Sequence, residues 1–278
     1  MINETVDLYE YFGMPRGENA GGILTAYVPY ATHEVSAKKR PAMIVFPGGG
    51  YWMLSDREKE PVALRFLSKG YSAFTLQYAV HTAYPVPLVE ACMAVAYIRE
   101  NAEKYSVDEE HIAAVGFSAG GHLAAMLATL FAEKEVKAVL GERNARPDAV
   151  ILSYPVITAD PRFWHEGSIR TISGEDEKLA ERLSAEKRVT KNSAPAFIWH
   201  TAEDDGVPVE NALLMAQAYR AAGVPFELHI FQNGCHGLSL ANEETANGRD
   251  DTRLIVPNVA QWVDLSLNWL ALRGFAVR

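Results

Sequence analysis

The sequence predicts an α/β fold with an eight-stranded, mostly parallel sheet and helices on both of its faces. The first observation is that short apolar runs end in Gly, Pro or Asp and alternate with segments of helical periodicity. The second is that several of these runs, such as residues 42–46, are apolar throughout, which is typical of strands buried on both faces. Repeated strand–crossover–strand units of this kind build parallel sheets covered by helices.

The first two expected strands have no helix between them. They cover residues 8–12 and 23–29, and a glycine-rich turn over residues 13–22 separates them. A connection without a helix predicts that these two strands pair antiparallel at one edge of the sheet.

The remaining six strands are separated by helical or irregular crossovers, as parallel pairing requires. They are expected over residues 42–46, 73–77, 112–117, 149–153, 196–200 and 226–231. The helices are expected over residues 58–68, 87–101, 119–131, 209–222 and, as an amphipathic C-terminal helix, 256–272. Residues 155–195 are irregular, with one short helix near 177–185, and are expected to form a short cap or surface insertion in a single domain of residues 1–278.

Composition narrows the class of protein. The 278 residues are 49% hydrophobic and 22% charged, which is ordinary globular composition, and the formal net charge of -9 argues against nucleic acid as a partner. The N-terminus lacks the basic and apolar regions of a signal peptide, and no apolar run reaches the roughly 20 residues that span a bilayer. The two cysteines, Cys92 and Cys235, have no metal-site spacing and are expected to be free thiols. These features predict a cytoplasmic protein without membrane partners.

The strongest motif is G-x-S-x-G at residues 116–120, between an expected strand and an expected helix. A serine on such a sharp turn is held in a strained conformation that exposes its hydroxyl, and glycines two residues before and after it relieve the crowding. The helix that begins there points N–H groups at developing negative charge. Ser118 is therefore the candidate nucleophile.

Serine needs a base and an acid that orients the base. His236 lies between two glycines in the loop after the last expected strand, where packing does not explain it, and it is the candidate base. The acid is expected after the strand over residues 196–200, where Glu203, Asp204 and Asp205 follow one another. Asp204 is the favoured acid and Asp205 the alternative, since Asp205 can instead cap the following helix.

The oxyanion formed in acyl transfer needs N–H donors. Three glycines at 48–50 follow the strand over residues 42–46 and let bare backbone approach the reacting carbonyl. The expected donors are the N–H groups of Gly49, Gly50 and Ala119, the last being the residue after the nucleophile. No G-x-G-x-x-G pattern or Gly-Lys-Ser/Thr sequence supports a phosphate-binding loop here.

Three side chains are candidates for substrate contact. Tyr51 directly follows the glycines, and His81 follows the strand over residues 73–77. Trp164, in the insertion, is expected to wall an acyl or sugar pocket, although an ordinary surface excursion with a buried aromatic anchor explains it equally well.

Together these motifs resemble those of α/β-hydrolases of the acetyl esterase and acetyl-xylan or feruloyl esterase-like group, which is related to the hormone-sensitive-lipase-like esterases. The resemblance rests on PGGGY at 47–51, SDRE at 55–58, GFSAGGH at 116–122, the segment from His200 to Pro208, and HG at 236–237. It implies Asp204 as the acid through D-x-x-V-P, and short acyl groups on sugars or simple alcohols as substrates. One departure is Pro47, which stands where the lipase-like enzymes have histidine.

The predicted function is therefore a serine carboxylesterase that hydrolyses short-chain, particularly acetyl, esters through an acyl-enzyme, with no cofactor and no metal. Its expected partner is a small ester substrate, for instance an acylated sugar or xylo-oligosaccharide, and a homodimer stays open. The alternatives are an amidase, arylformamidase or small serine peptidase on the same scaffold. A non-catalytic binding protein is disfavoured because every part of the triad is present.

Overall fold

The computed structural model describes residues 1–32, 34, 39–246 and 251–276. The strands in this part of the chain are β1 (Ile2–Asp7), β2 (Ile23–Val28), β3 (Arg40–Phe46), β4 (Ser72–Gln77), β5 (Val107–Phe117), β6 (Ala149–Ser153), β7 (Ala196–Thr201) and β8 (Phe226–Phe231). They form one sheet in the order β1-β2-β4-β3-β5-β6-β7-β8. Pairing is antiparallel for β1–β2 and β2–β4 and parallel for the other neighbours. The predicted eight-stranded, mostly parallel sheet is confirmed.

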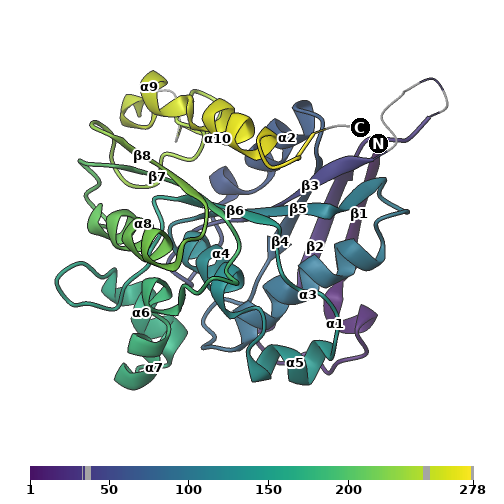
Figure 1. The fold of residues 1–278 in the computed structure, drawn as a ribbon, viewed down its shortest axis with the longest axis horizontal. Coiled ribbons are helices and arrows are strands. Elements are labelled where there is room, and N and C mark those ends of the chain that lie inside the picture. Colours follow the sequence, from purple (N-terminus) through teal and green to yellow (C-terminus); the bar gives the residue numbers. More distant parts are fainter. Residues whose placement is uncertain (33, 35–38, 247–250, 277–278) are drawn as a thin grey trace.

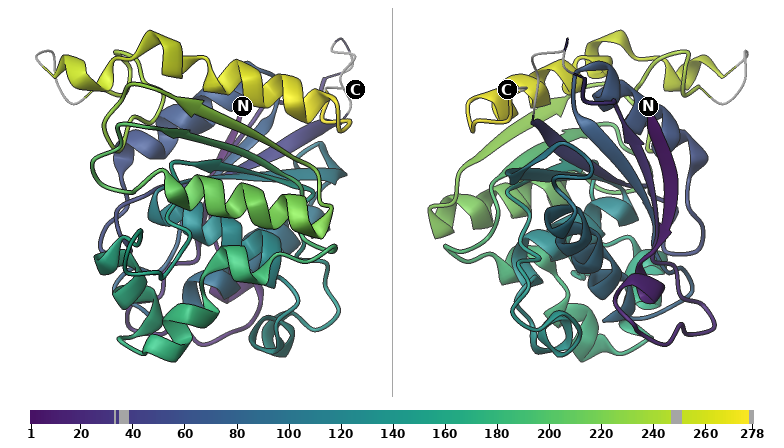
Figure 2. Two further views of the ribbon diagram at one scale, coloured as in Figure 1. Left: turned by 60° about the vertical axis from the view of Figure 1, so that its left-hand side comes forward. Right: turned by 90° about the vertical axis from the view of Figure 1, so that its right-hand side faces the viewer.

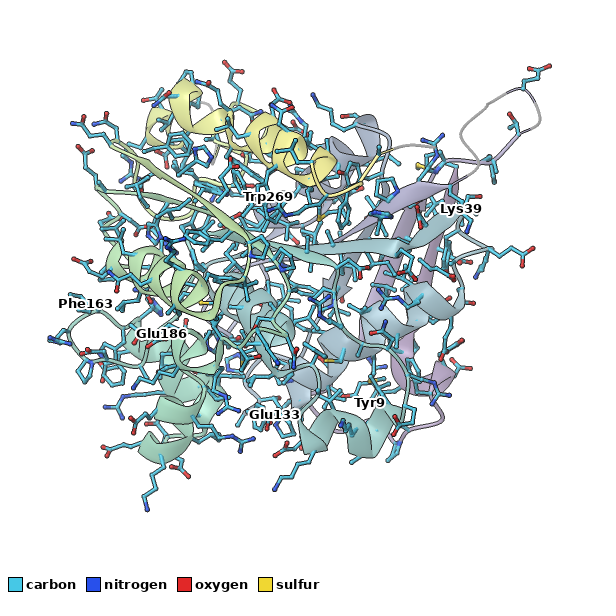
Figure 3. The ribbon with its side chains drawn as sticks, viewed as in Figure 1. Tyr9, Lys39, Glu133, Phe163, Glu186 and Trp269 are labelled. Carbon is cyan, nitrogen blue, oxygen red and sulfur yellow. The ribbon has the colours of Figure 1, made fainter. Side chains whose placement is uncertain are left out.

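Helices cover both faces of this sheet (Figures 1 and 2). They are α1 (Leu8–Tyr11), α2 (Glu60–Ser68), α3 (Val86–Glu100), α4 (Ala119–Leu130), α5 (Lys134–Leu140), α6 (Glu166–Ser173), α7 (Glu177–Arg182), α8 (Glu210–Ala222), α9 (Pro257–Ala260) and α10 (Trp262–Ala271). The pair α2 and α10 lies on one face, whereas α3, α4 and α8 lie on the other. Figure 3 shows Trp269 of α10 on the first side and Tyr9 on the second.

Each face of the sheet has its own hydrophobic core, because alternate residues of a strand point to opposite faces. Met43 and Val45 of β3 belong to the core beneath α2 and α10, which also contains Trp262. Ile44 and Phe46 of the same strand belong to the core beneath α3, α4 and α8. No helix in the described part of the chain is long and apolar enough to cross a membrane.

The first strand lies earlier than predicted. The strand expected over residues 8–12 is wrong, since β1 is Ile2–Asp7 and α1 follows it. Asp7 causes the change, because its Oδ1 accepts hydrogen bonds from the N–H groups of Tyr9 (2.9 Å) and Glu10 (3.3 Å) and so begins a helix. The predicted antiparallel pairing at the sheet edge still holds, between β1 and β2.

Three helical features differ from the prediction. The sequence analysis predicts neither α5 nor α6. The N-cap of α6 is His165, whose Nδ1 accepts from the Ser168 N–H (3.2 Å), and histidine is not a typical N-cap residue. The C-terminal helix is divided into α9 and α10 at Gln261. The buried residues Val259, Trp262 and Val263 continue the helical spacing across this break, so the apolar pattern alone does not reveal it.

Glu90 is a buried carboxyl on α3, in contact with the start of the chain. Its Oε1 accepts a hydrogen bond from Tyr9 Oη (2.9 Å), and its Oε2 accepts one from the Ala79 N–H (2.6 Å). Burial raises the pKa of Glu90 from its ordinary value of 4.5 to about 7, although these hydrogen bonds oppose the shift. Folded Glu90 therefore keeps its proton to a higher pH than unfolded Glu90, so its contribution to stability falls as the pH rises from 4.5 to about 7.

Replacing Glu90 by Gln is expected to remove this pH dependence. Gln is neutral at every pH and can still accept from Ala79 N–H while donating to Tyr9 Oη. Relative to wild type, we expect Glu90→Gln to be more stable by up to about 3 kcal/mol at pH 8 and nearly equal at pH 5. Urea unfolding of both proteins at the two pH values measures the difference. An equal stability difference at both pH values would contradict the raised pKa.

Candidate active site

Ser118 stands on a sharp turn between β5 and α4. Its backbone has φ 51° and ψ -116°, a strained combination for a residue with a side chain. A Cβ on Gly116 would overlap the Gly120 carbonyl, and one on Gly120 would overlap the Phe46 carbonyl. Both glycines of the G-x-S-x-G motif are therefore required by close backbone approach, and the turn carries the Ser118 hydroxyl into a cavity at the carboxyl edge of the sheet.

Two loops from neighbouring strands bring His236 and Asp204 to this serine. His236 follows β8, and its Nε2 lies 2.8 Å from Ser118 Oγ. Its Nδ1 lies 2.8 Å from Asp204 Oδ2 and 3.1 Å from Oδ1, and Asp204 follows β7. The three side chains thus form one hydrogen-bonded chain from hydroxyl to imidazole to carboxylate, in which His236 can accept a proton from Ser118.

Asp204 is held as a carboxylate. Its Oδ1 accepts from the N–H groups of Gly206 (2.9 Å) and Val207 (2.8 Å), and its side chain is almost fully buried. His200 Nε2 lies 3.3 Å from Oδ2. Burial on its own raises the pKa of Asp204, but the hydrogen bonds from His200 and His236 outweigh burial and hold the pKa well below its usual range.

Asp205 contacts the histidine differently. Its Oδ1 accepts from the backbone N–H of His236 (3.1 Å), so it holds the loop and not the imidazole. The geometry therefore favours Asp204 over Asp205 as the orienting acid.

The expected oxyanion donors surround the serine. Gly49 and Gly50 line the same cavity as Ser118, and Ala119 begins α4. Within the described residues, the N–H groups of these three residues bond to no acceptor, whereas the Gly48 N–H is occupied by Glu58 Oε2 (2.8 Å). The geometry thus leaves the amides of Gly49, Gly50 and Ala119 free to bind an oxyanion.

Glu58 is a residue of this site that the sequence did not single out as functional. It is 4% exposed and accepts two hydrogen bonds, from the Gly48 N–H and from Tyr154 Oη (2.5 Å). Tyr154 Oη accepts in turn from the Ser239 N–H (2.8 Å), and its ring contacts the His236 ring edge-on. Glu58 therefore connects the glycine loop to the histidine loop. The signal in the sequence that could have pointed to Glu58 is its place as the last residue of the SDRE motif at 55–58.

Replacing Glu58 by Gln is expected to lower kcat about 10- to 100-fold with little change in KM. Gln can still accept from the Gly48 N–H, but its NH₂ group then donates to Tyr154 Oη, which already accepts from the Ser239 N–H. The buried Tyr154 hydroxyl thereby loses its own acceptor, and we expect the glycine loop to shift. The oxyanion forms only in the transition state, so the loss falls on kcat. Steady-state kinetics measures it, and Glu60→Gln, at an exposed position two residues away, is the matched control. A stability loss with unchanged kcat would assign Glu58 a structural role alone.

The cavity around Ser118 has a volume of about 550 Å³. Besides the residues above, Trp52, Met53, Arg57 and His165 line it. Burial lowers the pKa of His165, and the nearby His236 adds to this effect. Trp52 and Met53 are each 59% exposed, so the cavity has an apolar rim.

Two of the three expected substrate contacts, Tyr51 and Trp164, do not line the cavity around Ser118. Tyr51 is fully buried, and its Oη bonds to His122 Nδ1 (2.9 Å), so it anchors the glycine loop and its side chain does not reach the cavity. Trp164 lines a different cavity, next to Pro161 and Lys187.

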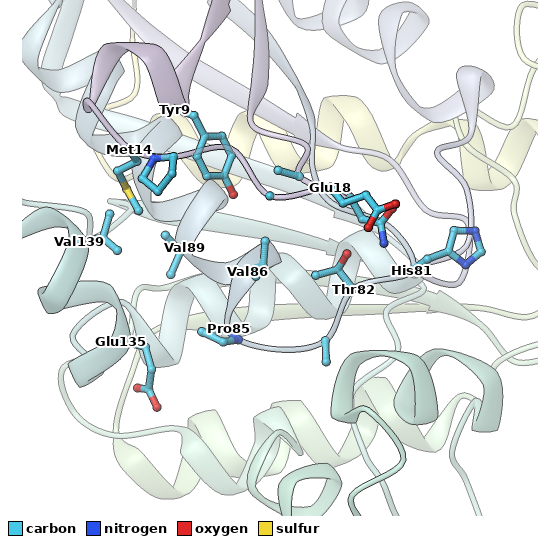
Figure 4. A pocket seen from close by; sticks show the side chains of 15 residues that line it. Tyr9, Met14, Glu18, His81, Thr82, Pro85, Val86, Val89, Glu135 and Val139 are labelled. Carbon is cyan, nitrogen blue, oxygen red and sulfur yellow. The ribbon is translucent and has the colours of Figure 1, made fainter.

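The third expected contact, His81, lines a neighbouring cavity of about 580 Å³, shown in Figure 4, and its ring contacts that of Trp52. Trp52, the residue after Tyr51, is the aromatic side chain of this loop that faces the cavity around Ser118. The described residues contain no cluster of three or more His, Cys, Asp or Glu side chains arranged to hold a metal ion.

The chain matches one family model and is similar to curated proteins. The BD-FAE family model matches residues 30–219. Endo-1,4-beta-xylanase B from Butyrivibrio fibrisolvens is 43% identical over 219 residues, which cover 76% of this chain and 34% of that protein. Acetylxylan esterase from Xylanibacter ruminicola is 31% identical over 204 residues, covering 70% of this chain and 40% of that protein. The chain thus spans well under half the length of these two curated relatives.

Solved structures match over the whole fold. The carboxylesterase Cest-2923 from Lactobacillus plantarum superposes with a TM-score of 0.85 at 30% identity, covering 100% of both chains. The acetyl ester-xyloside bifunctional hydrolase from Caldicellulosiruptor lactoaceticus superposes with a TM-score of 0.78 at 38% identity, covering 91% of this chain and 88% of that one.

Proposed function

Because this chain belongs to the BD-FAE family of α/β-hydrolases, we propose that it is a serine carboxylesterase that hydrolyses short-chain, particularly acetyl, esters. The observation that carries the proposal is the hydrogen-bonded chain Ser118–His236–Asp204, with links of 2.8 Å, beside unoccupied backbone amides. Acyl transfer needs this combination, because it supplies a nucleophile, a base and an oxyanion site at one point.

The proposed reaction proceeds through an acyl-enzyme. His236 Nε2 takes the proton of Ser118 as Oγ attacks the ester carbonyl, and the amides of Gly49, Gly50 and Ala119 bind the oxyanion. The tetrahedral intermediate collapses, the C–O bond to the alcohol breaks, and the imidazolium donates its proton to the leaving alkoxide. Asp204 stabilises the charged imidazole throughout. Water then attacks the acyl-enzyme with the same proton transfers, releasing the carboxylic acid and regenerating the serine.

The alcohol half of the substrate is proposed to be a sugar. Support comes from two similar proteins whose names refer to acetylxylan and to an acetyl ester together with a xyloside. The match to a xylanase covers only 34% of that protein, so we ascribe no glycosidase activity to this chain.

Initial hydrolysis rates for p-nitrophenyl acetate, butyrate and octanoate test the proposal, with Ser118→Ala as control. We expect the initial rate of the wild-type protein to fall steeply from acetate to octanoate, and we expect Ser118→Ala to lack this activity. Weak turnover of all three esters by a protein that still reacts with a fluorophosphonate probe would contradict the esterase proposal. In that case aminoacyl amides and formanilides would be the next substrates, since amidases, arylformamidases and small peptidases use the same machinery.

A further inference from the structure

An exposed indole is held in one orientation in the wall of the catalytic cavity. Trp52 is 59% exposed, so its ring gains little from burial. Its Nε1 nevertheless donates to Thr171 Oγ1 of α6 (2.7 Å), and its ring meets the His81 ring at a centroid distance of 5.5 Å. Fixing a large side chain costs rotamer entropy without a hydrophobic gain, which indicates a role in binding.

The backbone beneath this ring is strained and well anchored. Tyr51 and His81 both have positive φ, 63° and 54°, which costs residues with side chains about 1 kcal/mol or more each. The His81 N–H donates to the Tyr51 carbonyl (2.7 Å), and the buried Tyr51 side chain holds the loop through His122. The positions of Trp52 and His81 are therefore set by buried neighbours. We call this pair of side chains the aromatic ridge.

The two side chains of the aromatic ridge line two different cavities. Trp52 lines the cavity that contains Ser118, and His81 lines the second cavity of about 580 Å³. Because the two rings are in contact, we expect a ligand that extends from Ser118 over Trp52 to approach His81 at the edge of the second cavity.

The second cavity is polar beside the ridge and apolar at its far end. Figure 4 shows Glu18 and Thr82 on the same side of this cavity as His81, whereas Met14 and Val139 lie on the opposite side. Glu18 is exposed, and the Thr82 hydroxyl donates to the Val80 carbonyl (3.1 Å), which leaves its oxygen able to accept. A carboxylate and a hydroxyl next to an aromatic ring suit a neutral ligand with many hydroxyl groups.

We propose that the aromatic ridge binds the sugar ring that carries the ester, and that Glu18 and Thr82 bind hydroxyl groups of the next sugar ring. This inference rests on the proposed esterase function and names its preferred alcohol, a neutral glycoside of at least two pyranose rings. A pyranose presents C–H groups on its faces and hydroxyl groups around its rim, so its face packs on the indole while its rim donates to the carboxylate.

The test compares kcat/KM for three acetate esters: ethyl acetate, an acetylated methyl xyloside and an acetylated methyl xylobioside. We expect wild type to prefer the xylobioside. Trp52→Ala is expected to reduce the xylobioside-to-ethyl acetate ratio about tenfold, and Trp52→Phe, which keeps a ring, to restore most of it. Glu18→Gln is expected to reduce only the xylobioside-to-xyloside ratio, by about threefold. Leu272→Ala, at an 82% exposed position on the far side of the sheet, is the control and leaves both ratios unchanged.

Equal losses on all three esters in Trp52→Ala would overturn the proposal, because Trp52 would then only shape the glycine loop. A second measurement separates this inference from the esterase proposal. Unacetylated xylobiose is titrated into Ser118→Ala and into Ser118→Ala/Trp52→Ala, and binding is followed by calorimetry. Binding that depends on Trp52 supports the ridge even if no ester is hydrolysed, and an absence of binding to Ser118→Ala overturns it even if acetate esters are hydrolysed.

Discussion

Replacing Ser118 by alanine is expected to lower kcat/KM for p-nitrophenyl acetate by about a millionfold, the size of loss seen when a triad nucleophile is removed. Ser118 Oγ lies 2.8 Å from His236 Nε2, and the described part of the cavity has no second hydroxyl in this relation to the base. Thermal unfolding should be nearly unchanged, because alanine keeps the Cβ and meets the same positive φ of 51°.

The control for this result is the double variant Ser118→Ala/His236→Ala. If the two residues act as one unit, the double variant should be no less active than Ser118→Ala alone. Fluorophosphonate labelling should also disappear in Ser118→Ala. More than about one per cent residual activity, measured on protein free of wild type, would mean that another group is the nucleophile.

Replacing Asp204 by asparagine is expected to lower kcat by about 10⁴-fold. The carboxylate accepts the His236 Nδ1–H, which leaves Nε2 free to accept the serine proton. An amide can turn its NH₂ group to Nδ1 and so favour the tautomer in which Nε2 carries the hydrogen, and it cannot stabilise the imidazolium. Steady-state kinetics near neutral pH measures the loss.

Asp205→Asn is the matched control, because it makes the same chemical change one residue away. Among the described residues, Asp205 accepts from the His236 backbone N–H alone (3.1 Å), and an asparagine oxygen can do the same. We expect kcat to stay within about threefold of wild type. If Asp205→Asn lost activity and Asp204→Asn did not, the acid role would belong to Asp205.

The sequence by itself determined the architecture and pointed to the residues of the candidate centre. Continuous apolar runs such as residues 42–46 identify buried strands, because a strand covered on both faces needs apolar side chains on both faces. The G-x-S-x-G motif is equally local, since the glycines are required by atoms of the same turn and of the adjacent strand end. His236 was singled out as the candidate base because its place between two glycines after the last strand offered no packing role in the sequence.

Only the tertiary structure decided which side chain of a motif points where. Tyr51 and Trp52 are adjacent aromatic residues, but the buried His122 accepts the first as a partner and leaves the second at the cavity. Asp204 and Asp205 are chemically identical, and their contacts differ because the loop turns one carboxylate toward an imidazole and the other toward a backbone amide.

Glu58 lies 96 residues from Tyr154 in the chain, and the sheet brings them together. Side-chain direction and partner choice depend on contacts between distant segments, which composition and periodicity do not contain. The local patterns that define strands, turns and the candidate nucleophile are complete within a few residues. This difference in range explains why the sequence predicted the fold and the proposed reaction centre, while the structure decided the surrounding contacts.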